Sequence, residues 1–294
     1  MGLGNSPRKS VAADTPPGAS PGEPESGSGR ASSLVGQTLG GRYYIEKLLG
    51  EGGMGAVYLA EHTHMRKRMA VKVLHPDMTS MAEVVARFER EAMAAAHLEH
   101  PNIATATDFG QTDNGSFFLV LEFVEGMSLR DLIANHAPLS VPRALNILRQ
   151  IGNALQAAHA KGIVHRDLKP ENVMLVERNG EPDFVKLLDF GIAKVPVGEI
   201  TAAAKTSSPS HPGTPVLTQM GMVYGTPEYM SPEQAAGMEV DGRADQYAVG
   251  IIAYEMLCGE RPFDAENKVI VMRMHVTADV PPMAEKAPNV KVPA

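Results

Sequence analysis

The chain has 294 residues, of which 44% are hydrophobic and 21% charged, and its formal net charge is −7. This composition is typical of one or two globular domains, and it gives no electrostatic reason to expect nucleic acid or an anionic membrane as the main partner. The single cysteine, Cys258, excludes a disulfide within the chain and fits a reducing, cytoplasmic setting.

The N-terminus predicts a disordered tail. Residues 1–37 are rich in Pro, Gly and Ser and contain no aromatic residue, so they cannot bury enough apolar surface to offset the entropy of ordering. They lack the apolar region of a signal peptide, and no later stretch reaches the ~18–20 apolar residues that span a bilayer. We therefore expect no membrane segment in this chain.

A glycine-rich hairpin is expected next. GRYYIEKLLG (41–50) predicts a strand, GEGGMGAV (50–57) follows, and AVYLAEH (56–62) predicts a second strand. Because a strand rather than a helix follows the glycines, their spacing does not indicate a dinucleotide-binding fingerprint. Such a hairpin can hold phosphate through backbone N–H groups, although a plain flexible hairpin would have the same spacing.

The third strand, KRMAVKVLH (67–75), carries a lysine on an apolar face. Strand alternation places Ala70, Lys72 and Leu74 on the same side. An ammonium group there is costly without an anionic partner, unless the side chain extends to the edge of the sheet.

The following helix offers that partner. SMAE (80–83) has the form of a capping box, and the helix is expected to run to about residue 98. Glu91 interrupts its apolar stripe. Two opposite charges at apolar positions predict an ion pair between Lys72 and Glu91.

The pattern then changes from strands to helices. SFFLVLEFVEG (116–126) predicts a buried strand that ends in a polar linker, which divides a small β-rich unit (38–125) from a larger helical one (126–294). The apolar periodicity of residues 140–162 predicts a helix that Gly162 terminates.

After this helix comes HRDLKPEN (165–172). It sets a carboxylate, Asp167, between two cations, Arg166 and Lys169, and it ends in an amide, Asn172. A short strand follows, and then a second strand that ends in Asp-Phe-Gly. The residues alone leave open whether each polar group has a separate chemical task.

In this order the motifs resemble the protein kinase family, and most closely the bacterial serine/threonine kinases of eukaryotic type. The resemblance covers about residues 41–275 and includes GTPEYMSPEQ (225–234) and DQYAVGIIAYEMLCGERPF (245–263). It implies an α+β, bilobal fold, with a small β-rich N-lobe that contains one key helix and a larger, mainly helical C-lobe. It also implies transfer of phosphate from ATP, with Mg²⁺, to Ser and Thr hydroxyls of protein substrates.

The resemblance gives each charged group a role. Asp167 orients the acceptor hydroxyl and accepts its proton, and Lys169 steadies the transferring phosphate. Asn172 and Asp189 hold Mg²⁺ through oxygen ligands. The lysine–glutamate pair of the small lobe grips the α- and β-phosphates. The catalytic residues implied in this way are Asp167, Lys169, Lys72 and Glu91.

The resemblance also places residues around the nucleotide. Leu121 lies at the back of the adenine pocket, and the backbone groups of Glu122 and Val124 face the purine. Other positions sandwich the ring or belong to the glycine hairpin. The full set of ATP-binding positions is Leu49, Gly50, Gly52, Gly55, Val57, Ala70, Lys72, Leu121, Glu122, Val124 and Met174.

Regulation is expected in the activation segment, which has a flexible insertion at about 195–221. A phosphate on Thr218 would supply the counter-charge that Arg166 and Lys194 require, and it would order the loop. Thr226 is expected in the loop that docks the substrate.

Two other functions stay open from the residues. A pseudokinase, acting as a nucleotide-binding signalling scaffold, would hold ATP or partners without transfer, but no catalytic group is missing here. A small-molecule kinase on a related fold is disfavoured by GTPEYMSPEQ, which resembles the family's peptide-docking segment.

The C-lobe is expected to be incomplete at residue 294, and the full-length protein could carry a membrane anchor. The family pairs the Glu of its SPE triplet, here Glu233, with a later arginine. After Arg261 the only arginine is Arg273, within a helix expected at 265–276.

The last segment, residues 278–294, contains prolines that oppose a helix. Glu233 is therefore expected to lack its usual partner. The alternative is an ending in which Lys286 or Lys291 folds back onto Glu233.

Overall fold

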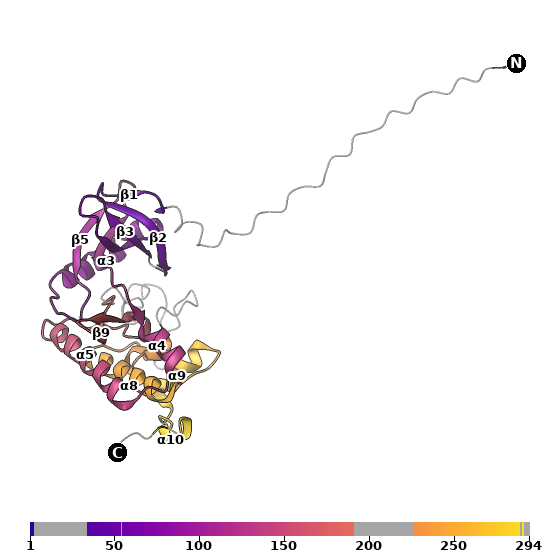
Figure 1. Ribbon diagram of the computed structural model, residues 1–294. Coiled ribbons are helices and arrows are strands. Elements are labelled where there is room, and N and C mark those ends of the chain that lie inside the picture. The colour runs from indigo at the N-terminus through magenta and orange to yellow at the C-terminus, as the bar shows by residue number, and fades with distance from the viewer. Residues whose placement is uncertain (3–33, 54, 191–225, 289, 291–294) are drawn as a thin grey trace.

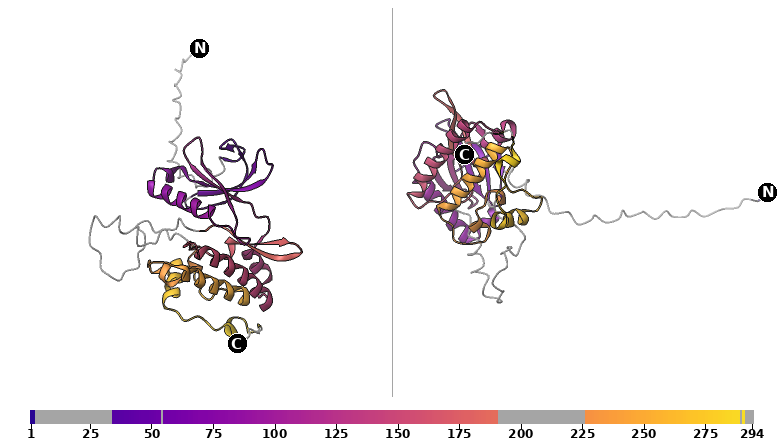
Figure 2. Two further views of the ribbon diagram at one scale, coloured as in Figure 1. Left: turned by 90° about the vertical axis from the view of Figure 1, so that its left-hand side faces the viewer. Right: turned by 90° about the horizontal axis from the view of Figure 1, so that it is seen from below.

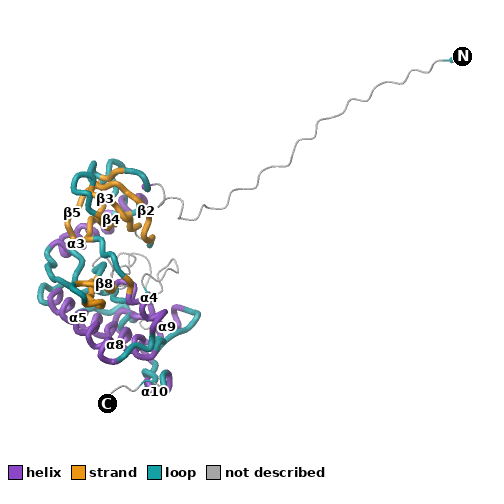
Figure 3. Tube along the Cα trace, in the orientation of Figure 1, coloured by secondary structure: helices purple, strands orange, loops and turns teal. Residues whose placement is uncertain are grey.

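The computed structural model describes residues 1–2, 34–53, 55–190, 226–288 and 290, without the side chains of residues 83, 87 and 91 (Figure 1). Most of the expected disordered tail and all of the insertion expected at about 195–221 lie outside these ranges. The described chain forms a sheet-rich N-lobe above a mainly helical C-lobe, as Figures 1 and 3 show. Within it, no helix is long and apolar enough to cross a membrane.

A six-stranded antiparallel sheet forms the N-lobe, in the order β1-β2-β3-β4-β6-β5. Its strands are β1 (Thr38–Leu39), β2 (Tyr43–Glu51), β3 (Gly55–His62), β4 (Arg68–Leu74), β5 (Ala106–Gln111) and β6 (Phe117–Glu122). Ile45, Val71 and Val73 pack in a core on one face, whereas Leu74 packs in a separate cluster with α3. The alternation predicted for β4 is therefore confirmed.

Two helices follow β4, α2 (Pro76–Thr79) and α3 (Ala82–Ala96). The predicted capping box is wrong, because the N-cap of α3 is Met81, which makes no side-chain cap. The Ser80 hydroxyl instead donates to the carbonyl oxygen of Asp77, at 3.0 Å. The Ser80 side chain therefore bonds to the backbone of α2 and does not cap α3.

The C-lobe contains a small sheet in the order β7-β8-β9, which lies on the side nearest the N-lobe (Figure 1). Its strands are β7 (Met127–Ser128), β8 (Val173–Arg178) and β9 (Glu181–Leu187). The helices are α4 (Leu129–His136), α5 (Val141–His159), α7 (Pro232–Ala235), α8 (Gly242–Cys258), α9 (Lys268–Thr277) and α10 (Met283–Lys286), with 3-10 turns η2 (Pro170–Asn172) and η3 (Pro227–Tyr229).

Helices α5 and α8 form the centre of the C-lobe and run side by side beneath β8 and β9 (Figure 2). Because α8 is apolar on most sides, it is largely buried, as such helices are. The helix predicted over 140–162 is confirmed as α5, and Gly162 follows it with a φ of 73°.

The end of the described chain differs from expectation in one respect. The helix predicted at 265–276 is confirmed as α9, but the last segment also contains one helical turn, α10. Ala287, just after that turn, packs against Tyr254 and the buried Cys258. This apolar contact offsets the prolines on either side of α10.

Candidate active site

The glycine hairpin lies beside the strand that carries Lys72. Gly50 of β2 pairs with Val57 of β3, and Val57 pairs with Lys72 of β4. Directly opposed residues point to the same face, so these three share one side of the sheet. A Cβ on Gly55 would lie 2.2 Å from the carbonyl oxygen of Val73, so only glycine allows β3 to start this close to β4.

Lys72 faces the Asp-Phe-Gly motif across the two lobes. Its Nζ lies 3.7 Å from Oδ1 of Asp189, and the two side chains are 23% and 37% exposed. Asp189 has a φ of 45°, in the left-handed region. The side chain of Glu91 lies outside the described atoms, so the Lys72–Glu91 pair stays a prediction.

The positions expected around adenine continue along the same face. Ala70 lies two residues before Lys72 and pairs with Leu121 of β6, so both lie on the Lys72 side. Met174 alternates with the buried residues of β8 and so points away from the C-lobe core. Leu49 is exposed near the end of β2, and Val124 is half-buried just after β6.

Glu122, the last residue of β6, is tied to the C-lobe. Its Oε2 lies 2.8 Å from Nζ of Lys186 on β9, and its backbone N–H donates to the carbonyl oxygen of Thr105. Lys186 is only 15% exposed, so this ion pair is shielded more than a surface pair. The connection between the lobes is thereby held against the strand that leads to Asp189.

His165 supports the loop that carries Asp167 from beneath. Its ring is fully buried and lies 4.6 Å from the ring of Phe190. Nε2 donates to the carbonyl oxygen of Leu188 at 3.0 Å, and Nδ1 accepts from the N–H of Asp167 at 3.4 Å. Burial lowers the pKa of the imidazole, so the ring is neutral, as these two bonds require.

A buried aspartate that the sequence reasoning missed holds the same loop. Asp245 of α8 accepts from the backbone N–H groups of His165 and Arg166, at 2.8 and 2.9 Å. It also lies 2.7 Å from Nε2 of His159. Gln234 donates to the carbonyl oxygen of Arg166 at 2.8 Å. The sequence does contain a signal for this role, because Asp245 is a carboxylate at the start of the apolar run of α8 and so has to find hydrogen-bond partners when buried.

Asp167, Lys169 and Thr226 meet at the front of this loop. The Lys169 ammonium lies 3.4 Å from Oδ2 of Asp167 and donates to the Thr226 hydroxyl at 2.9 Å. Asn172 donates from Nδ2 to the carbonyl oxygen of Asp167 and accepts at its own carbonyl from Leu188 N–H, both at 2.9 Å. The expected catalytic base, cation and docking residue are therefore adjacent.

A second polar cluster below this loop was also missed. Arg130 of α4 donates to Glu171 at 2.9 Å and to Glu255 at 2.7 Å, and it contacts the hydroxyl of Tyr229. That hydroxyl donates to Glu255 at 2.6 Å. Glu255 is a charge inside an apolar helix, which could have signalled a buried partner. The cluster joins α4, α8, η2 and η3.

Two expected regulatory positions gain no structural account. Lys194 and Thr218 lie outside the described residues. For Glu233, no basic side chain in the described part of the chain forms an ion pair with its carboxylate. The alternative for Lys286 is wrong, because its Nζ lies 3.5 Å from Glu260 instead, and Lys291 is not described.

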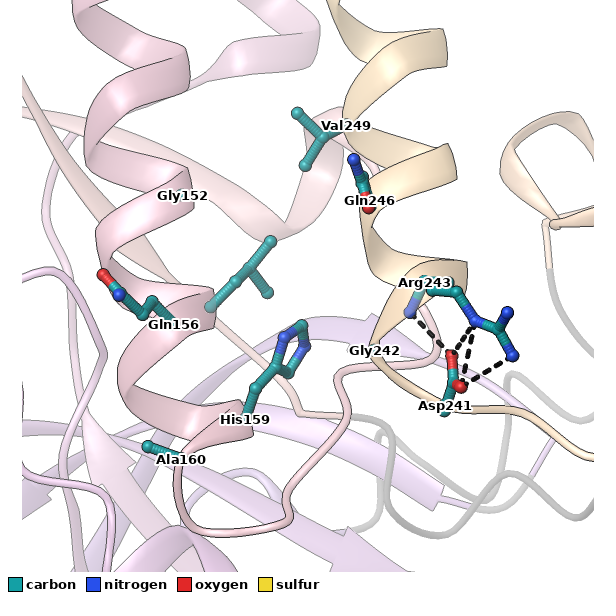
Figure 4. A pocket seen from close by; sticks show the side chains of 10 residues that line it. Gly152, Gln156, His159, Ala160, Asp241, Gly242, Arg243, Gln246 and Val249 are labelled. Atoms are coloured by element: carbon teal, nitrogen blue, oxygen red, sulfur yellow. Dashed lines mark hydrogen bonds and ion pairs between the residues drawn. The ribbon is translucent and has the colours of Figure 1, made fainter.

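A groove of about 750 Å³ lies elsewhere, between α5 and α8 (Figure 4). Its lining includes Leu155, Gln156 and His159 of α5 and Gly242, Arg243 and Val249 of α8. None of the expected site residues lines it. We therefore place the candidate active site at the interface of the two lobes, around Lys72, Asp167 and Asp189.

Comparison with known proteins identifies the family. The protein kinase domain family matches residues 43–292. The serine/threonine-protein kinase pkn3 of Myxococcus xanthus is 43% identical over 258 residues, which cover 88% of this chain and 45% of pkn3. The serine/threonine-protein kinase PrkC of Bacillus subtilis is 39% identical over 257 residues, covering 87% of this chain and 36% of PrkC.

The serine/threonine-protein kinase PknA of Mycobacterium tuberculosis is 40% identical over 265 residues, covering 88% of this chain and 57% of PknA. The chain thus spans only part of the length of these relatives. Among solved structures, the PknI kinase domain of M. tuberculosis superposes with a TM-score of 0.59 at 31% identity, covering 87% of this chain and 84% of that one. The chain belongs to the protein kinase family, and within it to the bacterial serine/threonine kinases of eukaryotic type.

Proposed function

We propose that this chain is an ATP-dependent protein kinase that transfers the γ-phosphate of Mg-ATP to Ser and Thr hydroxyls of proteins. The observation that carries the proposal is the position of Lys169, between the Asp167 carboxylate at 3.4 Å and the Thr226 hydroxyl at 2.9 Å. A carboxylate, a cation and a hydroxyl on the expected docking segment meet there, which suits phosphoryl transfer because that reaction depends on positioning the acceptor and on offsetting phosphate charge.

Asp167 is the group that acts on the acceptor. Its carboxylate orients the Ser or Thr hydroxyl and accepts the proton as the oxygen attacks phosphorus. Lys169 offsets the negative charge on the transferring phosphate from the same side. Neutral His165 fixes the backbone of Asp167 without adding a charge to the site.

The oxygen groups near Asp189 fit a magnesium ion. Asn172 uses its Nδ2 on Asp167, which leaves its side-chain oxygen as an acceptor, and Asp189 provides a partly exposed carboxylate. In the described residues, no group of three His, Cys, Asp or Glu side chains could hold a metal alone. One amide and one carboxylate suit an ion that takes its other ligands from phosphates and water. Bound there, Mg²⁺ would neutralise phosphate charge.

The N-lobe face provides the rest of the nucleotide site. Lys72 binds phosphate oxygens beneath the backbone N–H groups of the hairpin. The apolar side chains of Val57, Ala70 and Leu121 contact the adenine from above, and Met174 contacts it from below. The backbone groups of Glu122 and Val124, with Leu49 at the rim, complete the list of contacts.

Control by phosphorylation of Thr218 is part of the proposal. In the described part of the chain, no carboxylate forms an ion pair with the Arg166 side chain, which lies beside Asp167. A phosphothreonine would supply that charge, with Lys194 as a second cation. Mass spectrometry after incubation with Mg-ATP tests this, and a fully active enzyme with unmodified Thr218 would refute it.

Labelled-ATP incorporation into casein and into the chain itself tests the main proposal. We expect phosphoserine and phosphothreonine with the unaltered chain, and about 10²–10⁴-fold less with Asp167→Asn. ATP binding should be retained in Asp167→Asn. Nucleotide binding without any transfer by the unaltered chain would instead indicate a pseudokinase or nucleotide-binding scaffold.

A further inference from the structure

A histidine outside the expected site reaches the tip of the glycine hairpin. His75 follows β4 directly, and its Nε2 lies 3.0 Å from the carbonyl oxygen of Gly52. The same nitrogen lies 3.7 Å from Oε1 of Glu51, at the end of β2. Since Leu74 pairs with Gly55, the first residue of β3, His75 lies just beyond the paired strands and beside the turn that joins β2 to β3.

The hydrogen bond has a defined direction. A carbonyl oxygen can only accept, so Nε2 of His75 carries the hydrogen and donates to Gly52. The His75 side chain is 23% exposed, whereas Gly52 lies at the exposed tip of the hairpin. The Glu51 contact is longer and joins two partly exposed groups. We therefore attribute most of the restraint on the hairpin to the hydrogen bond with Gly52.

The His75–Gly52 hydrogen bond joins the hairpin tip to the residue just after β4, the strand that carries Lys72. Lys72 and His75 lie three residues apart, at the end of β4 and just beyond it. Across the sheet, Gly50 is aligned with Lys72 through Val57, and Gly52 is held by His75. One end of the hairpin is thereby held by β3, and its tip is held by the residue that follows β4.

We propose that His75 is a positioning residue for nucleotide binding. By donating to Gly52, its imidazole holds the glycine hairpin over the phosphate side of the site. The inference rests on the proposed function, since it assumes that the hairpin contacts ATP. A hairpin of glycines has much conformational freedom to lose, and a tether formed in advance lowers the entropy lost when ligand binds.

His75→Ala tests the contact, with His75→Gln as the rescuing variant, because a carboxamide can also donate to a carbonyl. His64→Ala is the matched control, since His64 is an exposed histidine in the turn at the other end of β3.

We expect His75→Ala to raise the Kd and KM for ATP by about 3- to 10-fold, as the loss of one hydrogen bond allows. We expect kcat to change less than about twofold, because the groups that act on the acceptor are untouched. His75→Gln and His64→Ala should resemble the unaltered chain.

Hydrogen exchange of the ligand-free protein gives a readout that does not depend on activity. The N–H of Gly52, which donates to Gly55, should exchange faster in His75→Ala and unchanged in His64→Ala. Unchanged exchange and an unchanged Kd in His75→Ala would overturn the inference, as would a loss confined to kcat. If the unaltered chain transfers no phosphate, the proposed function is contradicted instead. The exchange measurement still shows whether His75 restrains the glycine hairpin.

Discussion

Asp245 accepts a hydrogen bond from the backbone N–H of Arg166, with 2.9 Å between N and Oδ1. Arg166 has a φ of 63°, a left-handed conformation that costs a non-glycine residue about 1–2 kcal/mol. The two hydrogen bonds that Asp245 accepts, from the N–H groups of Arg166 and His165, offset that strain. Helix α8 thereby fixes the backbone on the N-terminal side of Asp167.

Replacing Asp245 should therefore weaken both fold and catalysis. An Asn at this position keeps one acceptor oxygen but loses the charge and one of the two acceptors, so at least one buried N–H is left unpaired. We expect Asp245→Asn to lower the free energy of unfolding by about 2–4 kcal/mol in urea titrations. We expect kcat to fall by at least about tenfold, because Asp167 loses its fixed position.

Asp241→Asn is the matched control for that variant. Asp241 is the exposed N-cap of the same helix, and asparagine caps a helix about as well as aspartate. Equal unfolding free energies for Asp245→Asn and the unaltered chain would contradict the support that we assign to Asp245.

The hydroxyl of Thr226 is expected to orient Lys169. A hydrogen bond to a charged donor is stronger than a neutral one, and its loss leaves the ammonium less well placed. Thr226→Ala should lower kcat by at least about tenfold with little change in the KM for ATP. Thr226→Ser keeps the hydroxyl and should retain most activity. If both variants lose activity equally, the methyl group rather than the hydroxyl is the important feature.

The strands and the order of motifs were predictable because they depend on local patterns. Lys72 lies on the face that strand alternation requires, and the helix at α5 follows its apolar period. Asp245 was not predictable in this way, because its partners are backbone groups 79 and 80 residues away. Ser80 was misassigned because a capping hydroxyl would accept from a backbone N–H of α3, whereas this hydroxyl donates to the carbonyl oxygen of Asp77 in α2.

Two buried histidines predict lower stability in acid. Burial lowers the pKa of His165 and of His275, whose Nδ1 lies 2.8 Å from the Tyr247 hydroxyl. Below the unfolded-state value of about 6.5, the unfolded chain binds protons that the folded chain excludes, so stability falls as pH falls. Each histidine contributes a slope of up to about 1.4 kcal/mol per pH unit.

Urea titrations between pH 7.5 and pH 5.5 measure this slope. Histidine ring signals in NMR spectra of the folded protein should show that both rings titrate below the ordinary pKa of about 6.5. A free energy of unfolding that does not change over this range would contradict the effect of burial.

Magnesium binding is expected to require nucleotide. Asp189 contributes the only carboxylate that we assign to the ion, and without phosphate it faces the Lys72 ammonium at 3.7 Å. A divalent cation that binds alone would have to compete with this charge and would gain only one amide oxygen besides, from Asn172. When ATP is bound, its phosphates provide further oxygen ligands for the ion. The phosphates also attract the Lys72 ammonium, which leaves the Asp189 carboxylate available to Mg²⁺. Calorimetric titration of Mg²⁺ should therefore show no saturable binding to the protein alone. With a non-hydrolysable ATP analogue it should show clear binding that remains after the heat of Mg²⁺ binding to the free analogue is subtracted. Asp189→Asn should remove the second signal, whereas Asp264→Asn, at an exposed site paired with Arg261, should leave it unchanged. Saturable Mg²⁺ binding without nucleotide that survives in Asp189→Asn would place the metal elsewhere.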